Sequence, residues 1–167
     1  MKALLPNIYQ ATKTIRPIHL LKMVKAPAAM YIVKAGEEVV LIDPFLLPES
    51  ETQSLEALGQ PTFIFIAGTW HVRDAEAYRK RYGAKILAHR EAVPKLGLRV
   101  EDVFGDCDTL PGGLTAIPMR GTMPGETIFR HHDGKGTLIA GDALFNIPPN
   151  WRPLVMKARR SAVATCS

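Results

Sequence analysis

Three residues able to bind a metal or form a buried ion pair stand where predicted strands give way to loops. Asp43 ends "VVLIDPF", His71 follows the strand of "FIFIAGTWHVRD", and Asp142 ends "TLIAGDAL". Side chains at the carboxyl ends of buried strands converge in α/β proteins, so these residues could form one site. Carboxylate and imidazole groups brought together there are the donors that divalent metals such as zinc use in proteins.

Two interpretations stay open for His71. It either has a functional role at this site, or it hydrogen-bonds Asp142 or Asp43 and substitutes for a metal. Because a buried carboxylate is costly unless a protic or positive group neutralises it, we expect Asp142 to pair with His71 or Arg73. For Asp43 we expect a mainly structural role, in which the side chain accepts N–H groups of nearby loops.

The elements that must position these residues follow from hydrophobic patterning. Apolar stretches predict a hairpin of two strands, Met30–Val33 and Val39–Ile42, and then a buried strand, Thr62–Ile66. They also predict the strand "KILAH", Lys85–His89, and a later hairpin whose turn, Asp133–Gly136, runs into the buried strand Thr137–Ala140. A short helical turn followed by a loop is expected in "REAVPKLGL", which Pro94 and Gly97 interrupt.

Two helices are predicted from start and stop signals. The first has Ser50 as N-cap and Gln53 three residues on, a capping box, and stops at Gly59. The second covers Asp74–Tyr82, with apolar residues on one face and Gly83 as its stop. Both helices follow predicted strands, an order typical of α/β folds.

The composition bounds the kind of protein. With 167 residues, 47% of them hydrophobic, the chain fits one domain, which we place at 1–150, followed by a basic and mobile tail at 151–167. Four of the 21 basic residues and none of the 16 acidic ones lie after residue 150, so the domain is nearly neutral. We therefore expect neither a nucleic-acid nor a membrane partner.

Two further expectations concern location and redox state. The N-terminus lacks the continuous apolar region of a secretory signal, which predicts a cytoplasmic protein. Cys107 and Cys166 lie far apart without a CxxC pair, and this spacing argues against a disulfide framework and a cysteine-based zinc site. No role is expected for either cysteine.

The order of these pieces resembles the metallo-β-lactamase superfamily over roughly Tyr31 to Phe145. The shared features are a hairpin ending in "LID", a strand, loop and helix ending in "RYGAKILAH", a "PG" loop at Pro124–Gly125, and the strand end "GDAL". The resemblance implies an α/β fold, an αββα sandwich of two mixed sheets, here incomplete at the C-terminus. It also implies a hydrolase-like activity and places His71 and Asp142 beside one metal position.

Most of the metal ligands that the resemblance implies are missing from this chain. The family's HxHxDH loop aligns its last His with His71, its Asp with Trp70, and its first two histidines with Ile66 and Gly68. In the alternative register His71 is an earlier histidine, which still gives one imidazole. Thr122 stands where the family commonly has a His before the PG pair, and no histidine follows His132. Surface or satisfied packing roles are expected for the other histidines, which are His19, His89, His131 and His132.

Three functional classes follow. In the first class the protein is a hydrolase-like enzyme with catalytic Asp142 and His71, which also hold one weakly bound zinc, iron or manganese ion. The residues that would support this site are Asp43, Arg73, Thr122 and Trp70. Alternatively it is a metal-free module that binds a small molecule in the old cleft. In the third class it is an interaction subunit, for example a homo-oligomer, because a shortened sandwich exposes a sheet edge. The substrate is not predicted.

Overall fold

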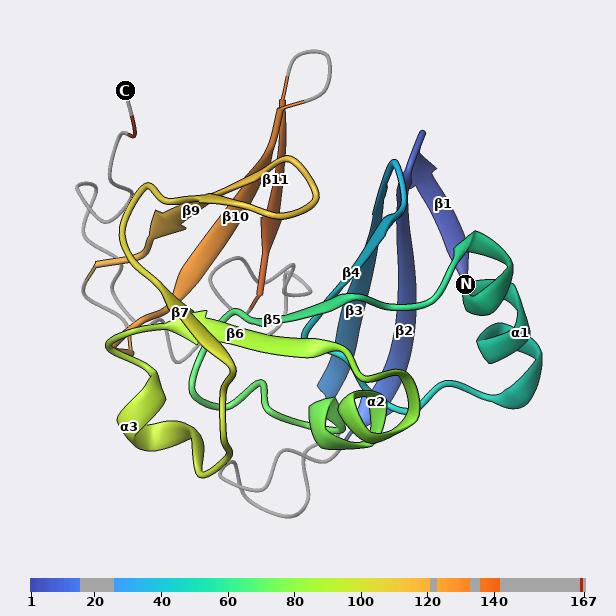
Figure 1. Ribbon diagram of the computed structural model, residues 1–167, viewed down its shortest axis with the longest axis horizontal. Coiled ribbons are helices and arrows are strands. Elements are labelled where there is room, and N and C mark those ends of the chain that lie inside the picture. Colours follow the sequence, from blue (N-terminus) through green and yellow to red (C-terminus); the bar gives the residue numbers. More distant parts are fainter. Residues whose placement is uncertain (16–25, 121–122, 133–135, 142–165, 167) are drawn as a thin grey trace, which may run out of the picture.

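The computed structural model describes residues 1–15, 26–120, 123–132, 136–141 and 166 of the chain. In this part of the chain two β-sheets pack face to face, and three helices lie on one side of the larger sheet (Figure 1). The strands are β1 (Lys2–Leu5), β2 (Ile8–Ile15), β3 (Ala26–Ala35), β4 (Glu38–Ile42), β5 (Phe63–Ile66), β6 (Lys85–His89), β7 (Asp102–Phe104), β8 (Thr109–Leu110), β9 (Leu114–Pro118), β10 (Thr127–His131) and β11 (Thr137–Ala140). The helices are α1 (Glu49–Leu58), α2 (Ala75–Tyr82) and α3 (Val93–Leu96).

The larger sheet is mixed and has the strand order β1-β2-β3-β4-β5-β6-β7. Strands β1 to β4 pair antiparallel, whereas β4, β5, β6 and β7 pair parallel. The smaller sheet has the order β11-β10-β9-β8, and all its described pairs are antiparallel. Parallel pairing brings the carboxyl ends of β4 to β7 to one edge, where their following loops can meet.

Alternation along the strands divides the core into two layers. Side chains such as Leu41, Ile64 and Ile86 point toward the helices, where they cluster with Leu55 of α1 and Tyr78 of α2. Their strand neighbours Val40, Phe65 and Leu87 point between the sheets. There they cluster with Phe104 of β7, Ala116 of β9 and Phe129 of β10. Burial on both faces explains why β5 is continuously apolar. The expected α/β sandwich is thus present over the described residues.

Helix α1 begins differently from the prediction. It starts after Pro48, whose carbonyl accepts the N–H groups of Glu51 and Thr52 at 3.0 and 2.9 Å, and no side chain caps it. The predicted capping box at Ser50 and Gln53 is therefore wrong, because the chain enters the helix at Glu49 and leaves Ser50 inside the first turn. The stops at Gly59 and Gly83, the second with φ of 71°, are as expected.

The cysteine prediction is also wrong. Cys107, in the turn between β7 and β8, forms a disulfide with Cys166, with Cα atoms 5.4 Å apart. Sequence spacing could not reveal this pair because the proximity of the two cysteines depends on tertiary packing, which places Cys166 beside Ala116 of β9. Disulfides are typical of oxidising compartments, so this pair does not support the expected cytoplasmic location. That location stays a prediction. No helix in the described residues has the length and apolarity needed to cross a membrane.

Four strands were not predicted. They are β1, β2, β7 and β8. Strand β2 alternates only loosely between buried and exposed residues, with Ile8 and Ala11 facing the core. The other three are edge strands or pieces of two to four residues, too short for a periodic pattern.

Candidate functional site

Asp43 is the centre of a buried polar cluster at the carboxyl end of β4. Its Oδ1 atom accepts the Ala67 N–H at 2.8 Å, and its Oδ2 atom lies 2.5 Å from His71 Nδ1. Its own N–H donates to the Phe65 carbonyl at 3.0 Å. Both partners of the Asp43–His71 pair are nearly inaccessible, with side-chain exposures of 4% and 3%. The expected acceptance of a loop N–H by Asp43 is present, together with one of the two hydrogen bonds considered for His71.

Arg73 contacts the same cluster through hydrogen bonds to the backbone. Its Nη1 atom donates to the carbonyl oxygens of Asp43 at 2.9 Å and Ala29 at 2.7 Å. The guanidinium thus connects the loop after β5 with the end of β4 and with β3. In the described residues these contacts go to backbone carbonyls, so Arg73 supports the position of Asp43.

The backbone at this cluster is strained. Asp43 and Arg73 have positive φ angles of 52° and 40°, which non-glycine residues rarely adopt. Such conformations persist where surrounding contacts over-determine them, and they concentrate at functional sites. Here the hydrogen bonds of Asp43 and Arg73 are the contacts that hold these conformations in place.

Glu126 approaches the same loop from the other sheet. It follows Gly125, immediately before β10, and is only 7% exposed. Its carboxylate lies directly over Gly68, so that a Cβ atom at Gly68 would overlap with Glu126 Oε2. The neighbouring Thr127 N–H donates to the Ala67 carbonyl at 2.8 Å and ties the two sheets together here. Glu126 and His71 therefore flank Gly68, whose carbonyl accepts the His71 N–H at 3.0 Å.

A second polar group lies at the ends of β6 and β7. His89 Nε2 is 3.0 Å from Asp106 Oδ1, and Asp106 Oδ2 accepts a hydrogen bond from Arg120 Nη2 at 2.6 Å. The Glu91 N–H approaches His89 Nδ1 at 3.3 Å. His89 is buried, with both ring nitrogens engaged, which agrees with the satisfied packing role expected for it.

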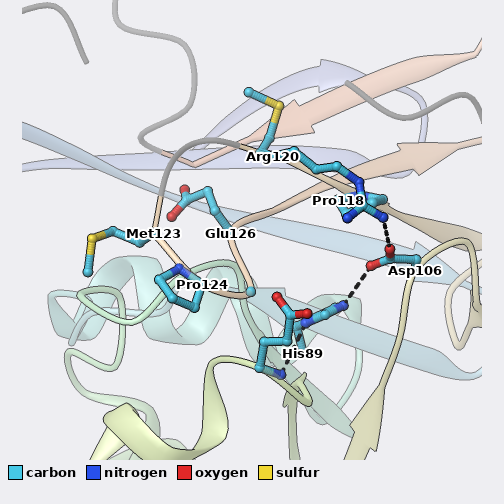
Figure 2. A pocket seen from close by; sticks show the side chains of 10 residues that line it. His89, Asp106, Pro118, Arg120, Met123, Pro124 and Glu126 are labelled. Atoms are coloured by element: carbon cyan, nitrogen blue, oxygen red, sulfur yellow. Dashed lines mark hydrogen bonds and ion pairs between the residues drawn. The ribbon is translucent and has the colours of Figure 1, made fainter. Parts of the chain in front are cut away.

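Figure 2 shows this group in the wall of a cavity of about 230 Å³. The cavity lies between the end of β6, the turn after β7, the end of β9 and the loop that contains Pro124 and Gly125. Its lining residues are His89, Glu91, Asp106, Pro118, Met119, Arg120, Met123, Pro124, Gly125 and Glu126. Glu126 therefore lines the cavity and also contacts the loop that carries His71, at Gly68.

The other predicted site residues are only partly placed. Asp142 and Thr122 lie outside the described residues, so the predicted pairing of Asp142 stays a prediction. Gly141, the residue before Asp142, packs so closely on the His71 ring that a Cβ atom there would lie 2.7 Å from Cε1. Trp70 is 54% exposed beside His71.

Three site residues were missed. Glu126, Asp106 and Arg120 each come from a loop whose position depends on how the two sheets pack. The available signal for Glu126 was a single carboxylate between the Pro124–Gly125 pair and an apolar strand. A charged residue in that place is solvent-exposed in most sequences, so its burial is not predictable from type alone.

Comparisons with known proteins identify the family. A model described as the metallo-beta-lactamase superfamily matches residues 23–150, and the chain therefore belongs to this superfamily. This confirms the resemblance inferred from the "LID", "PG" and "GDAL" elements. No match was found among curated proteins.

Solved metallo-beta-lactamases share the fold at low sequence identity. A HARLDQ motif mutant from Cronobacter sakazakii is 17% identical, with a TM-score of 0.56, and the match covers 83% of this chain and 62% of that one. BJP-1, a subclass B3 enzyme of Bradyrhizobium japonicum, is 18% identical, with a TM-score of 0.53 and coverages of 68% and 55%. LRA-12, a class B3 di-zinc enzyme from an Alaskan soil metagenome, is 16% identical, with a TM-score of 0.54 and coverages of 68% and 56%. The matches thus span roughly three fifths of these relatives' length.

Proposed function

We propose that the protein is a hydrolase-like metallo-β-lactamase-fold protein that does not form a dinuclear zinc centre and binds a small molecule in its cleft. The observation that carries the proposal is the position of Glu126 over Gly68. A histidine at position 68, where the family resemblance puts a ligand, has no room unless Glu126 moves. The cleft is the cavity at the carboxyl ends of β6 and β7.

The remaining donors fit a dinuclear centre poorly. Ile66 is fully buried inside β5 and Gly68 has no side chain, while Trp70 offers only an indole N–H, which is a donor. Among the described residues, no group of three or more His, Cys, Asp or Glu side chains is placed to hold a metal ion. Asp43 instead has its charge compensated by the Ala67 N–H and the His71 ring.

One observation favours a second candidate, a single weakly bound divalent ion. His71 turns Nδ1 toward a buried carboxylate, which is the orientation that metal-binding histidines use while Nε2 ligates. The ion would be held by His71 Nε2 and Glu126, with Asp142 as the third donor expected from the sequence. When bound, it would supply Lewis-acid activation of water or a carbonyl group. The chain's own contribution is the Asp43 hydrogen bond that orients the imidazole.

Elemental analysis of tag-free protein separates the two candidates. The protein is measured as purified, and again after saturation with zinc, iron or manganese followed by gel filtration. We expect well under one equivalent of metal in wild type, with no change in His71→Ala or Glu126→Gln, because the described residues place too few donors together. His132→Ala is the control, since His132 is exposed and bonded to Thr115 at 2.6 Å.

The outcomes are distinct. One equivalent that is lost in both His71→Ala and Glu126→Gln but kept in His132→Ala would establish the single-ion candidate. Two retained equivalents would overturn the proposal. Hydrolysis of ester and lactam substrates that a chelator abolishes, with one equivalent of metal bound, would support the single-ion candidate instead.

A further inference from the structure

We propose that the Cys107–Cys166 disulfide is a redox switch that controls the wall of the cavity. A dithiol reductant opens this bond, and opening loosens the turn that carries Asp106. The switch goes beyond the proposed function, because it concerns a covalent link within the chain and requires no particular ligand. It rests on the position of both cysteines against the cavity wall and on the exposure of Cys107.

Cys107 lies in a turn that backbone hydrogen bonds fix to β9. Its N–H donates to the Ala116 carbonyl at 2.8 Å, and the Asp108 carbonyl accepts the Ala116 N–H at 3.0 Å. Asp108 Oδ2 also accepts the Gly105 N–H at 2.7 Å. Cys107 itself has φ of 64°, which is unfavourable for a non-glycine residue. The disulfide therefore adds a covalent constraint to a turn whose conformation needs support.

The same turn forms part of the cavity wall. Asp106, the residue before Cys107, has its Oδ1 atom 3.0 Å from His89 Nε2. Its Oδ2 atom accepts a hydrogen bond from Arg120 Nη2 at 2.6 Å (Figure 2). Asp106 thus links the end of β6 to the residue that follows Met119. Because Asp106 and Cys107 are adjacent, a change in the backbone of Cys107 moves this carboxylate relative to both partners.

Cys166 connects the disulfide to the cavity by a second route. It packs against a small apolar cluster that consists of Ile117, Met119 and Ile128. Its Sγ atom lies 3.8 Å from the Ala116 carbonyl oxygen, which also accepts the Cys107 N–H. Met119 lines the cavity as well. Once the S–S bond is broken, no covalent bond joins Cys166 to the turn, and both contacts with the wall lose this constraint.

The exposure of Cys107 gives a reductant access to the bond. Cys107 is exposed and Cys166 is half-buried, and exposed disulfides are the more easily reduced ones. A thiolate of the dithiol attacks Cys107 Sγ, the S–S bond breaks, and Cys166 leaves as a thiolate that takes a proton from solvent. The second thiol of the reductant then displaces Cys107 as a thiol and closes the dithiol into its own disulfide. Two electrons pass from the dithiol to the protein.

A purely stabilising disulfide is the competing interpretation. A bond between residues 59 positions apart restricts the unfolded chain and stabilises the fold wherever its ends lie. Reduction of such a bond lowers stability but leaves the folded cavity wall unchanged. The contacts of both cysteines with wall residues or their neighbours favour the switch, and the experiment separates the two interpretations.

The first measurement is the rate of reduction of the full chain by dithiothreitol. Free thiols are alkylated and counted by mass spectrometry, once for the folded chain and once in urea. We expect the folded chain to be reduced at a rate within about tenfold of the unfolded one, because the bond is reached from solvent. A bond that is reached only through unfolding would react about a thousandfold more slowly or less, and this result would overturn the proposal.

The second measurement is NMR of the histidine rings, which reports the cavity wall. Reduction should shift the His89 ring signals and leave those of His71 unchanged, since His71 is bonded to Asp43 in a different loop. Cys166→Ser without reductant should reproduce the His89 signals of reduced wild type. Dithiothreitol added to Cys166→Ser is the control, and it should cause no further shift.

Three other outcomes would overturn the proposal. They are unchanged His89 signals in reduced, folded wild type; unfolding of wild type on reduction, since a switch needs two folded states; and two free thiols in wild type after treatment with oxidised glutathione. If Cys166→Ser fails to fold, reduced wild type alone decides the matter. These measurements involve neither metal nor ligand, so the proposed function is tested separately.

Discussion

Among single residues, Asp43 connects most of the candidate site. Its carboxylate receives the Ala67 N–H and the His71 ring, and its carbonyl receives Arg73. The residue adopts a positive φ at a buried position, a combination that costs energy unless these partners are all present. The hydrogen bonds of Asp43 therefore contribute to stability as well as to the orientation of His71.

Asp43→Asn tests this role. The amide keeps the shape but places an NH₂ group or a neutral oxygen against His71 Nδ1, so we expect the free energy of unfolding to fall by about 1–3 kcal/mol. We also expect ¹⁵N NMR to show a changed tautomer at His71. Asp74→Asn is the control, because Asp74 accepts an exposed hydrogen bond from the Leu46 N–H, and its loss should stay below about 1 kcal/mol. Equal losses in the two variants would contradict a special role for Asp43.

Among the elements, the loop between β9 and β10 decides where Glu126 lies. Gly125 has φ of 74°, and a Cβ atom there would lie 2.6 Å from the backbone nitrogen of Ala92. The loop thus presses on the segment before α3 with no space for a side chain. A glycine is required here by both conformation and packing.

Gly125→Ala and Gly113→Ala separate these two requirements. Gly113 has a similar φ of 66° and open space around it, so its substitution should cost about 1–2 kcal/mol from backbone conformation alone. Gly125→Ala should cost about 1–3 kcal/mol more because Ala92 must shift. Urea unfolding measures both, and equal costs would show that the loop moves aside freely.

Much of the element order could be predicted from the sequence. The β3–β4 hairpin, β5, α2 and β6 follow from local periodicity and glycine stops, which act within a few residues. Glu126 and Asp106 could not be predicted as site residues, because they meet the loop of His71 and the end of β6 only through sheet packing. The disulfide of Cys107 was missed for the same reason.

For the molecule as a whole, helix α2 anchors the helical layer to the sheet. The Tyr78 hydroxyl donates to the Phe45 carbonyl at 3.0 Å, and burial raises the pKa of Tyr78 from 10.0 to about 12. Between these values the folded chain keeps a phenolic proton that the unfolded chain releases. Stability should therefore be full below about pH 10 and fall as pH rises toward about 12.

Tyr78→Phe checks this expectation. The variant should be less stable near neutral pH, because the Phe45 carbonyl loses its donor, yet its stability should change less between about pH 9 and about pH 11. Urea unfolding at the two pH values gives the comparison. Tyr82→Phe is the reference, since Tyr82 also has a pKa raised to about 12 by burial but is partly exposed. A wild-type stability that rises with alkalinity would contradict the assignment.

The hydrogen bond from the Thr127 N–H to the Ala67 carbonyl joins the two sheets at a residue with no solvent exposure. Its deuterium exchange requires the two layers to separate at this edge, rather than a strand end to fray. The Thr127 amide signal therefore reports how often the two sheets separate beside His71. A ligand that slows this exchange stabilises the contact between the two sheets.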